Sequence, residues 1–136
     1  MSLNSEERTI IVRLEYEKAR KTFEQIPELM KLGYWDNIAN RLYYSVFHAV
    51  ASLLIHDGHP VNTHKGAIAL FGNYYIRTGI LPSEAGRLYS DLQTMRNNSD
   101  YNCSYSATQK EIEPLIEPAE KLIDRIGQII GLQSLD

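Results

Sequence analysis

Two long segments of the chain carry apolar side chains at alternating steps of four and three residues, which is the spacing of one face of an α-helix. The two stripes consist of Val12, Tyr16, Ala19, Phe23, Ile26 and Met30, and of Ile112, Ile116, Ala119, Ile123, Ile126 and Ile130. No strand-like alternation of apolar and polar residues occurs between them. Because the two stripes match in length, we expect the first and last helices to pack together.

Turn and capping residues divide the chain into about five helices, so the predicted fold class is an all-α bundle. We expect the first helix to run from a cap at Asn4, with Glu7 as its reciprocal partner, to a stop at Gly33. Pro27 is expected to kink this helix because it has no backbone N–H to donate. The second helix is predicted over about residues 34–57, where "HDGHP" ends it.

The remaining three helices are delimited in the same way. The third is predicted to follow a cap at Asn62 or Thr63 and to run to about residue 77. The fourth starts at residues 82–83 and is expected to end near Arg96, because "NNSD" consists of turn-forming residues. The last opens with Thr108 and Glu111 at capping-box spacing.

Composition restricts the class of protein. The 136 residues suit a single domain spanning 1–136, and a net charge of -3 argues against a broad basic surface for nucleic acid. The single cysteine, Cys103, cannot form an internal disulfide, and it has no paired base that would make it a nucleophile. The longest apolar run is short and contains His48, so we expect no membrane span and a cytoplasmic protein.

No cofactor or metal site is predicted. The sequence has no glycine-rich phosphate loop, and the spacing of His56, His59 and His64 fits no closed zinc pattern. His56 stands near the end of the second predicted helix, His59 in the loop that follows it, and His64 at a helix start.

Arg96 is the unusual residue of the fourth helix, because it shares a face with Tyr89 and Leu92. One interpretation is structural: its charged head extends past the edge of the core, or bonds the last carbonyls of its own helix. The other is an anion site for phosphate, which the planar guanidinium suits, with Tyr101 as a nearby hydroxyl and Asp100 as a pairing group. The residues alone leave both open.

A polar stripe on the second helix poses the same choice. Its members recur at helical spacing away from the apolar face, and they are Asn37, Asn40 or Arg41, Tyr44 and His48. This stripe is either a hydrogen-bonded seam between helices or the wall of a binding site.

Three segments, "NRLYYSVFHAVASLLI", "THKGAIALFGNYYIRTG" and "GRLYSDLQTMRNNSDY", resemble the HEPN domain family over about residues 8–127. They are most similar to its small stand-alone members, in which "RLYYAxFHA" precedes "THxG" and an arginine that leads into "ADY". The resemblance implies an up-and-down bundle that forms a symmetric homodimer. It also implies a ribonuclease, often a toxin of a toxin–antitoxin pair, or a protein encoded beside a minimal nucleotidyltransferase partner.

The family's nuclease motif is an arginine, a polar residue and, a few positions later, a histidine, and two copies meet at the dimer interface. Arg96 and Asn97 match the first two positions, whereas Tyr101 fills the histidine position. A tyrosine with a pKa of ~10 is a poor base at neutral pH, although it can donate a hydrogen bond to phosphate. His48 is the candidate to supply an imidazole instead.

Two functional hypotheses follow from this resemblance. The one we favour, because the histidine is missing, is a nucleotide- or RNA-binding or nucleotidyltransferase-partner module. Its dimer-interface cleft is expected to be lined by Arg96, Asp100, Tyr44, Asn40 and Arg41. The alternative is a metal-independent ribonuclease that uses Arg96, Asn97, Tyr101 and His48. A structural dimer with an Arg96–Asp100 ion pair is a third, simpler possibility.

Overall fold

The computed structural model describes residues 3–132, and over that range the chain forms helices joined by loops. The elements are α1 (Ser5–Phe23), α2 (Ile26–Leu32), α3 (Trp35–His56), α4 (His64–Phe71), the π-helical turn η1 (Gly72–Ile76), α5 (Ser83–Tyr101) and α6 (Gln109–Ile130). The prediction of an all-α fold is confirmed.

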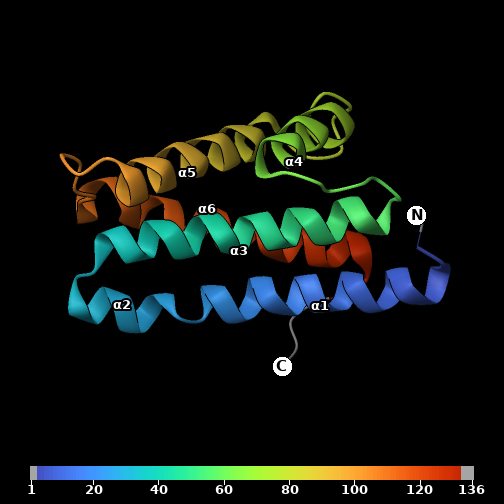
Figure 1. The fold of residues 1–136 in the computed structure, drawn as a ribbon, viewed down its shortest axis with the longest axis horizontal. Coiled ribbons are helices and arrows are strands. Elements are labelled where there is room, and N and C mark those ends of the chain that lie inside the picture. Colours follow the sequence, from blue (N-terminus) through green and yellow to red (C-terminus); the bar gives the residue numbers. More distant parts are fainter. Residues whose placement is uncertain (1–2, 133–136) are drawn as a thin grey trace.

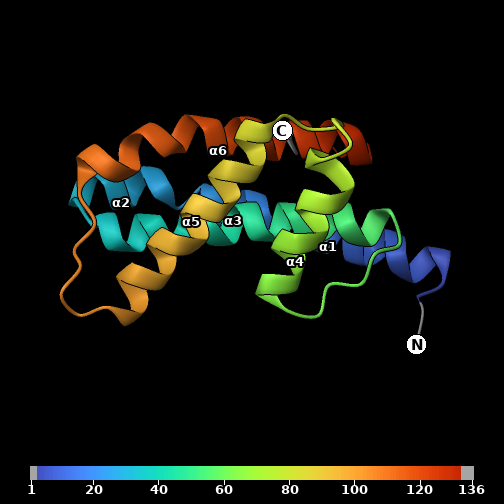
Figure 2. The same cartoon turned by 90° about the horizontal axis from the view of Figure 1, so that it is seen from above.

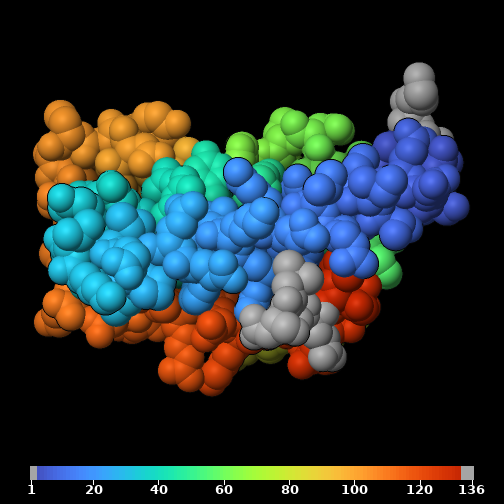
Figure 3. Space-filling model, turned by 90° about the horizontal axis from the view of Figure 1, so that it is seen from below, coloured from blue at the N-terminus to red at the C-terminus, as the bar shows by residue number. Residues whose placement is uncertain are grey.

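The long helices alternate in direction, so the bundle is of the up-and-down type. Figure 1 shows α1 and α2 in one row, α3 running back beside them, α5 returning, and α6 running back again. Seen from above, α4 and α5 both lie across α3 (Figure 2). The opposite side is formed by α1 and α2, with α6 along one edge (Figure 3).

The α3 helix is the centre of the bundle, because it contacts every other α-helix. Its fully buried side chains include Ile38, Leu42, Val46, Ala49 and Leu53. Among the residues described here, α3 is also the one helix long and apolar enough to cross a membrane by length and composition. However, 67% of its most apolar window is buried inside the bundle, which is the environment of a central core helix.

The expected packing of the first helix against the last is confirmed. The buried Tyr16 hydroxyl of α1 donates a hydrogen bond of 3.1 Å to the Ile123 carbonyl of α6. Arg20 forms an ion pair with Asp124 one turn further along. Gly127 permits this approach, since a Cβ at that position would overlap the Tyr16 hydroxyl and the Leu132 carbonyl oxygen.

Three predicted helix starts are confirmed by their caps. Asn4 and Glu7 make both hydrogen bonds of the capping box. The Thr63 side chain accepts a hydrogen bond from the Gly66 N–H at 2.8 Å, and Thr108 accepts one from the Glu111 N–H. Each cap satisfies a backbone donor that lacks a partner in the first helical turn.

The first predicted helix is divided rather than kinked. The α1 helix ends at Phe23, and Pro27 lies in the first turn of α2. A proline ring excludes the carbonyl four residues earlier, which here belongs to Phe23, so the helical ladder cannot continue through this point.

The predicted end of the fourth helix near Arg96 is wrong, because α5 continues to Tyr101. The turn-forming residues 97–100 are therefore helical. Asn40 of α3 donates a hydrogen bond of 3.2 Å to Asp100, and Arg96 packs on α3 tyrosine rings. These tertiary contacts hold a last turn that local propensity alone disfavours.

We predict that Gly127→Ala lowers the stability of the bundle by about 1–3 kcal/mol, because the added methyl must displace Tyr16 or the chain around Leu132. Thermal unfolding followed by circular dichroism should show a Tm lower by several degrees. Gly72→Ala is the matched control, since nothing lies within 4 Å of its Cβ position. Equal Tm values for the two variants would contradict this account of α1–α6 packing.

Candidate functional site

Arg96 is buried on the inner face of α5, with 7% of its surface exposed. Its guanidinium carbon lies 4.8 Å from the ring centroid of Tyr43 and 5.4 Å from that of Tyr44, both on α3. Cation–π contacts at these distances are attractive and strengthen when the cation is removed from water. The guanidinium therefore packs against the rings of two adjacent tyrosines of α3.

Tyr101, at the end of α5, is the third tyrosine that contacts the guanidinium. Its ring centroid is 5.8 Å from the guanidinium carbon, and its hydroxyl accepts a hydrogen bond of 3.4 Å from Arg96 Nη1. Tyr101 is itself 76% exposed. The nearest carboxylate oxygen, on Asp100, lies 3.8 Å from Nη1, beyond hydrogen-bond distance.

The guanidinium is therefore incompletely satisfied. Its Nε is buried and has no hydrogen-bond partner among residues 3–132. Burial opposes the charged form, but Tyr44, Tyr43 and Tyr101 outweigh it and raise the pKa of Arg96. The arginine thus stays charged while part of its donor capacity is unused.

His64 is the imidazole closest to this cluster. Its Nδ1 lies 2.8 Å from the Tyr43 hydroxyl, and its ring centroid is 5.8 Å from that of Tyr44. Burial, followed by the positive charges of Arg96 and His48, lowers the pKa of His64. Burial raises the pKa of Tyr43, so its hydroxyl keeps its proton. His64 is therefore a neutral imidazole that shares a hydrogen bond with Tyr43, one of the two tyrosines on which Arg96 packs.

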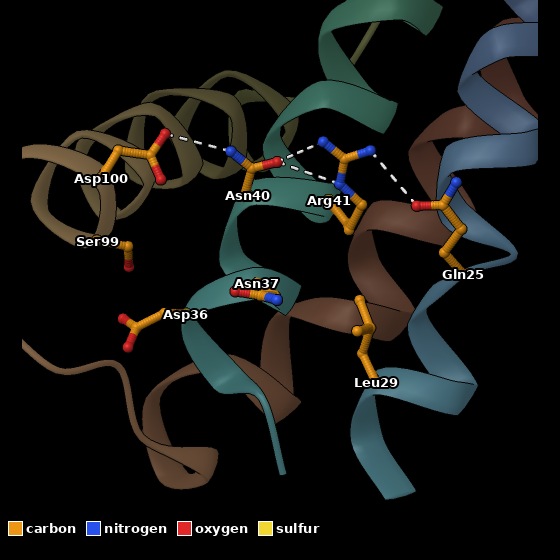
Figure 4. A pocket seen from close by; sticks show the side chains of 8 residues that line it. All are labelled: Gln25, Leu29, Asp36, Asn37, Asn40, Arg41, Ser99 and Asp100. Atoms are coloured by element: carbon orange, nitrogen blue, oxygen red, sulfur yellow. Dashed lines mark hydrogen bonds between the residues drawn. The ribbon is translucent and has the colours of Figure 1, made fainter. Parts of the chain in front are cut away.

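Beyond Asp100 the site continues into a pocket of about 390 Å³ between α3, α2 and the end of α5 (Figure 4). Its lining consists of Gln25, Leu29, Asp36, Asn37, Asn40, Arg41, Ser99 and Asp100. Asn40 connects the two parts, because its amide donates to Asp100 at 3.2 Å and its oxygen accepts from Arg41 at 3.1 and 2.5 Å.

The histidines do not gather around a common point. His56 bonds Asp57 at 2.8 Å, and His59 stacks on Tyr74 with ring centroids 3.9 Å apart. Within the described part of the chain, no three His, Cys, Asp or Glu side chains are placed to hold a metal ion.

This geometry can be set beside known proteins. A family model, described as HEPN domain, matches residues 12–129 of the chain. The chain belongs to the HEPN domain family. It is 27% identical over 124 residues to the "UPF0332 protein" of Thermotoga maritima, an alignment that covers 91% of this chain and 94% of the relative.

Two further relatives come from Methanocaldococcus jannaschii. The chain is 33% identical over 97 residues to "Putative toxin MJ0605", covering 71% of each protein. It is 26% identical over 109 residues to "Putative toxin MJ0142", covering 80% of this chain and 74% of the relative.

Most of the site residues predicted for this HEPN protein lie together. Arg96, Asp100 and Tyr101 of α5 face a group on α3 that consists of Asn40, Arg41 and Tyr44. Asn97 follows Arg96 on α5 and is exposed. These contacts make the polar stripe of α3 both a hydrogen-bonded seam and the wall of a pocket.

His48 bonds away from Arg96: its Nδ1 is 3.0 Å from a carboxylate oxygen of Glu15 on α1, although its ring centroid lies 6.3 Å from that of Tyr44. The sequence analysis did not select Tyr43 or His64 as site residues, although the structure places both at the centre. His64 belongs to the "THKG" segment and directly follows the cap of α4, which is the sequence signal that could have identified it.

We predict that His64 of this HEPN protein titrates below its ordinary pKa of ~6.5. Because the unfolded chain binds this proton more readily than the folded one, stability should decline as the pH falls from ~6.5 towards the lowered value. Replacing Arg96 by Gln removes a nearby positive charge and should therefore raise the pKa of His64. NMR of the imidazole protons as a function of pH measures the midpoint of this titration.

Arg41→Gln is the control for this titration. It also removes one positive charge, from the pocket lining, but Arg41 is not among the groups that shift the pKa of His64. A wild-type midpoint at or above 6.5, or one that Arg96→Gln leaves unchanged, would overturn the assignment of His64 to the arginine's surroundings.

Proposed function

We propose that this HEPN protein binds RNA or a nucleotide by holding a phosphate group at Arg96. The observation that carries the proposal is an arginine that is only 7% exposed and yet has a buried Nε without a hydrogen-bond partner among residues 3–132. Leaving a buried donor unpaired is costly, and such cost is tolerated where a ligand supplies the missing acceptor. A phosphate offers several acceptor oxygens to a planar guanidinium.

Access to the site depends on the two residues that end α5. Asp100 lies 3.8 Å from Arg96, so it neutralises the arginine weakly and can stay with Asn40 when an anion arrives. Tyr101 is exposed and contacts Arg96 through one long hydrogen bond of 3.4 Å. A phosphate that enters between Asp100 and Tyr101 can accept hydrogen bonds from the guanidinium, and the Tyr101 hydroxyl can donate a further one.

The proposal includes a homodimer in which two copies face each other around their Arg96 clefts. A net charge of -3 leaves few cations for RNA, so joining two clefts would concentrate those that matter. Sedimentation of the purified protein should give twice the mass of one chain. A minimal nucleotidyltransferase is the proposed partner, and co-purification with the product of an adjacent gene tests it.

A second candidate function is a metal-independent ribonuclease acting as a toxin. The observation that favours it is the neutral His64 imidazole beside the tyrosines that hold Arg96. A neutral imidazole can accept a proton near neutral pH. The two relatives named as toxins add support for a toxin-like role.

We predict that Arg96→Gln weakens binding of a fluorescent single-stranded oligoribonucleotide by about 10- to 100-fold, the value of one or two charge-assisted hydrogen bonds. Fluorescence anisotropy at fixed salt measures the change. An oligouridine should bind Asp100→Asn more tightly than wild type, because the substitution removes a negative charge 3.8 Å from Arg96 Nη1.

Arg125→Gln is the matched control, since Arg125 is an exposed arginine on α6. The binding proposal fails if Arg96→Gln, folded according to circular dichroism, and Arg125→Gln reduce affinity equally.

The ribonuclease candidate predicts that the purified protein cleaves single-stranded RNA in the presence of EDTA. Cleavage should be lost in Arg96→Gln and reduced in His64→Gln, whereas His48→Gln should retain it because His48 is engaged with Glu15. Identical activity in wild type and Arg96→Gln would mark the cleavage as a contaminant. Binding without cleavage would reject this second candidate and leave the first intact.

A further inference from the structure

The pocket beside Asp100 presents hydrogen-bond acceptors that the protein itself does not use. Asp36 accepts the Ala107 N–H with Oδ1 at 2.9 Å, which leaves its Oδ2 available. Asp100 accepts from Asn40 with Oδ2, which leaves its Oδ1 available. The Ser99 hydroxyl is buried without a hydrogen-bond partner among residues 3–132. Figure 4 shows these three side chains along one side of the pocket.

Arg41 occupies the other side of the pocket and is held in place. Its Nε and Nη2 donate to Asn40, and its Nη1 donates to Gln25 Oε1 at 3.4 Å. Three of its five N–H groups are used in this way, and its guanidinium carbon lies 5.9 Å from the Tyr44 ring centroid. A guanidinium held in place offers a flat face, and such faces stack on nucleic-acid bases. Figure 4 shows Asn40 between Arg41 and Asp100, with Asn37 below it.

We propose that this pocket binds a guanine base, attached to the phosphate that Arg96 holds. This inference rests on the proposed function and specifies its ligand. Guanine is the base that presents two adjacent donors, N1–H and the 2-amino group, on its pairing edge. The Asp36 carboxylate can accept both, because the oxygen that accepts the Ala107 N–H keeps a second lone pair. Adenine, cytosine and uracil present an acceptor next to their donor on that edge, which would face the carboxylate oxygens unfavourably.

Size and connection to Arg96 agree with this assignment. A volume of about 390 Å³ lies in the range of small-molecule sites, about 300–1,000 Å³. Asp100 belongs to the pocket lining and also lies 3.8 Å from Arg96, so base and phosphate would sit on neighbouring parts of one surface. The guanine can come from a free nucleotide or from a residue within single-stranded RNA.

The test compares guanosine, inosine and adenosine monophosphates as competitors, and oligouridines that carry one central guanosine or adenosine. We expect guanosine to be preferred over inosine, which lacks the 2-amino group, and over adenosine by roughly tenfold or more. Asp36→Asn keeps an acceptor for Ala107 but offers an amide to the base, so it should abolish most of this preference. Asp91→Asn, at an exposed position of α5, is the matched control.

The outcomes separate the two proposals. Binding that depends on Arg96 but shows no preference for guanine, or a preference that Asp36→Asn leaves unchanged, would overturn the guanine pocket while the phosphate site stands. Absence of any nucleotide or RNA binding would overturn both. A guanine preference seen with the oligonucleotides alone supports an RNA residue as ligand, and one seen equally with the mononucleotide supports a free guanine nucleotide.

Discussion

The contact between the Arg96 guanidinium and the tyrosine rings of α3 is the interaction on which the site depends. Removing a cation from water costs several kcal/mol, and its closest carboxylate, on Asp100, is 3.8 Å away. Three ring faces within 4.8–5.8 Å return about 0.5–2 kcal/mol each. The buried position of the Arg96 guanidinium is therefore maintained by the packing of the surrounding helices as well as by its own contacts, which is common at binding sites.

That support comes from α3, which is anchored on the side facing α1. The buried Ser52 hydroxyl donates to the Val12 carbonyl of α1 at 2.7 Å, and apolar residues of α3 fill the space between the helices. Because α3 is held against α1 in this way, helix geometry determines where the side chains of Asn40, Tyr43 and Tyr44 point. The α5 helix packs against this surface, and its last turn is stabilised by the hydrogen bond from Asn40 to Asp100.

The sequence was informative where the physical cause is local. Helical periodicity and the caps at Asn4, Thr63 and Thr108 determine most of the helix boundaries, and all three caps are present. The end of α5 was mispredicted because the bond from Asn40 to Asp100 joins residues 60 positions apart. Local propensities for residues 97–100 contain no information about that partner.

For the site, too, local patterns predicted some residues, whereas tertiary contacts determine the position of the others. Spacing along α3 correctly grouped Asn40, Arg41 and Tyr44 on one surface. Whether His48 reaches Arg96 depends instead on which neighbouring helix each edge of α3 faces, and His48 faces Glu15 of α1. His64 is brought to the site by the crossing of α4 over α3, a feature of tertiary structure that periodicity does not determine.

The placement of His64 also bears on the choice between binding and cleavage. Its Nδ1 is engaged with the Tyr43 hydroxyl, so proton transfer from that nitrogen towards Arg96 would pass through Tyr43. Burial raises the pKa of Tyr43, which makes its hydroxyl a poor relay near neutral pH. Tyr101, at the position of the family's histidine, can donate to phosphate but is a weak base. The described side chains are thus better arranged to hold a phosphate than to activate the hydroxyl that would attack it.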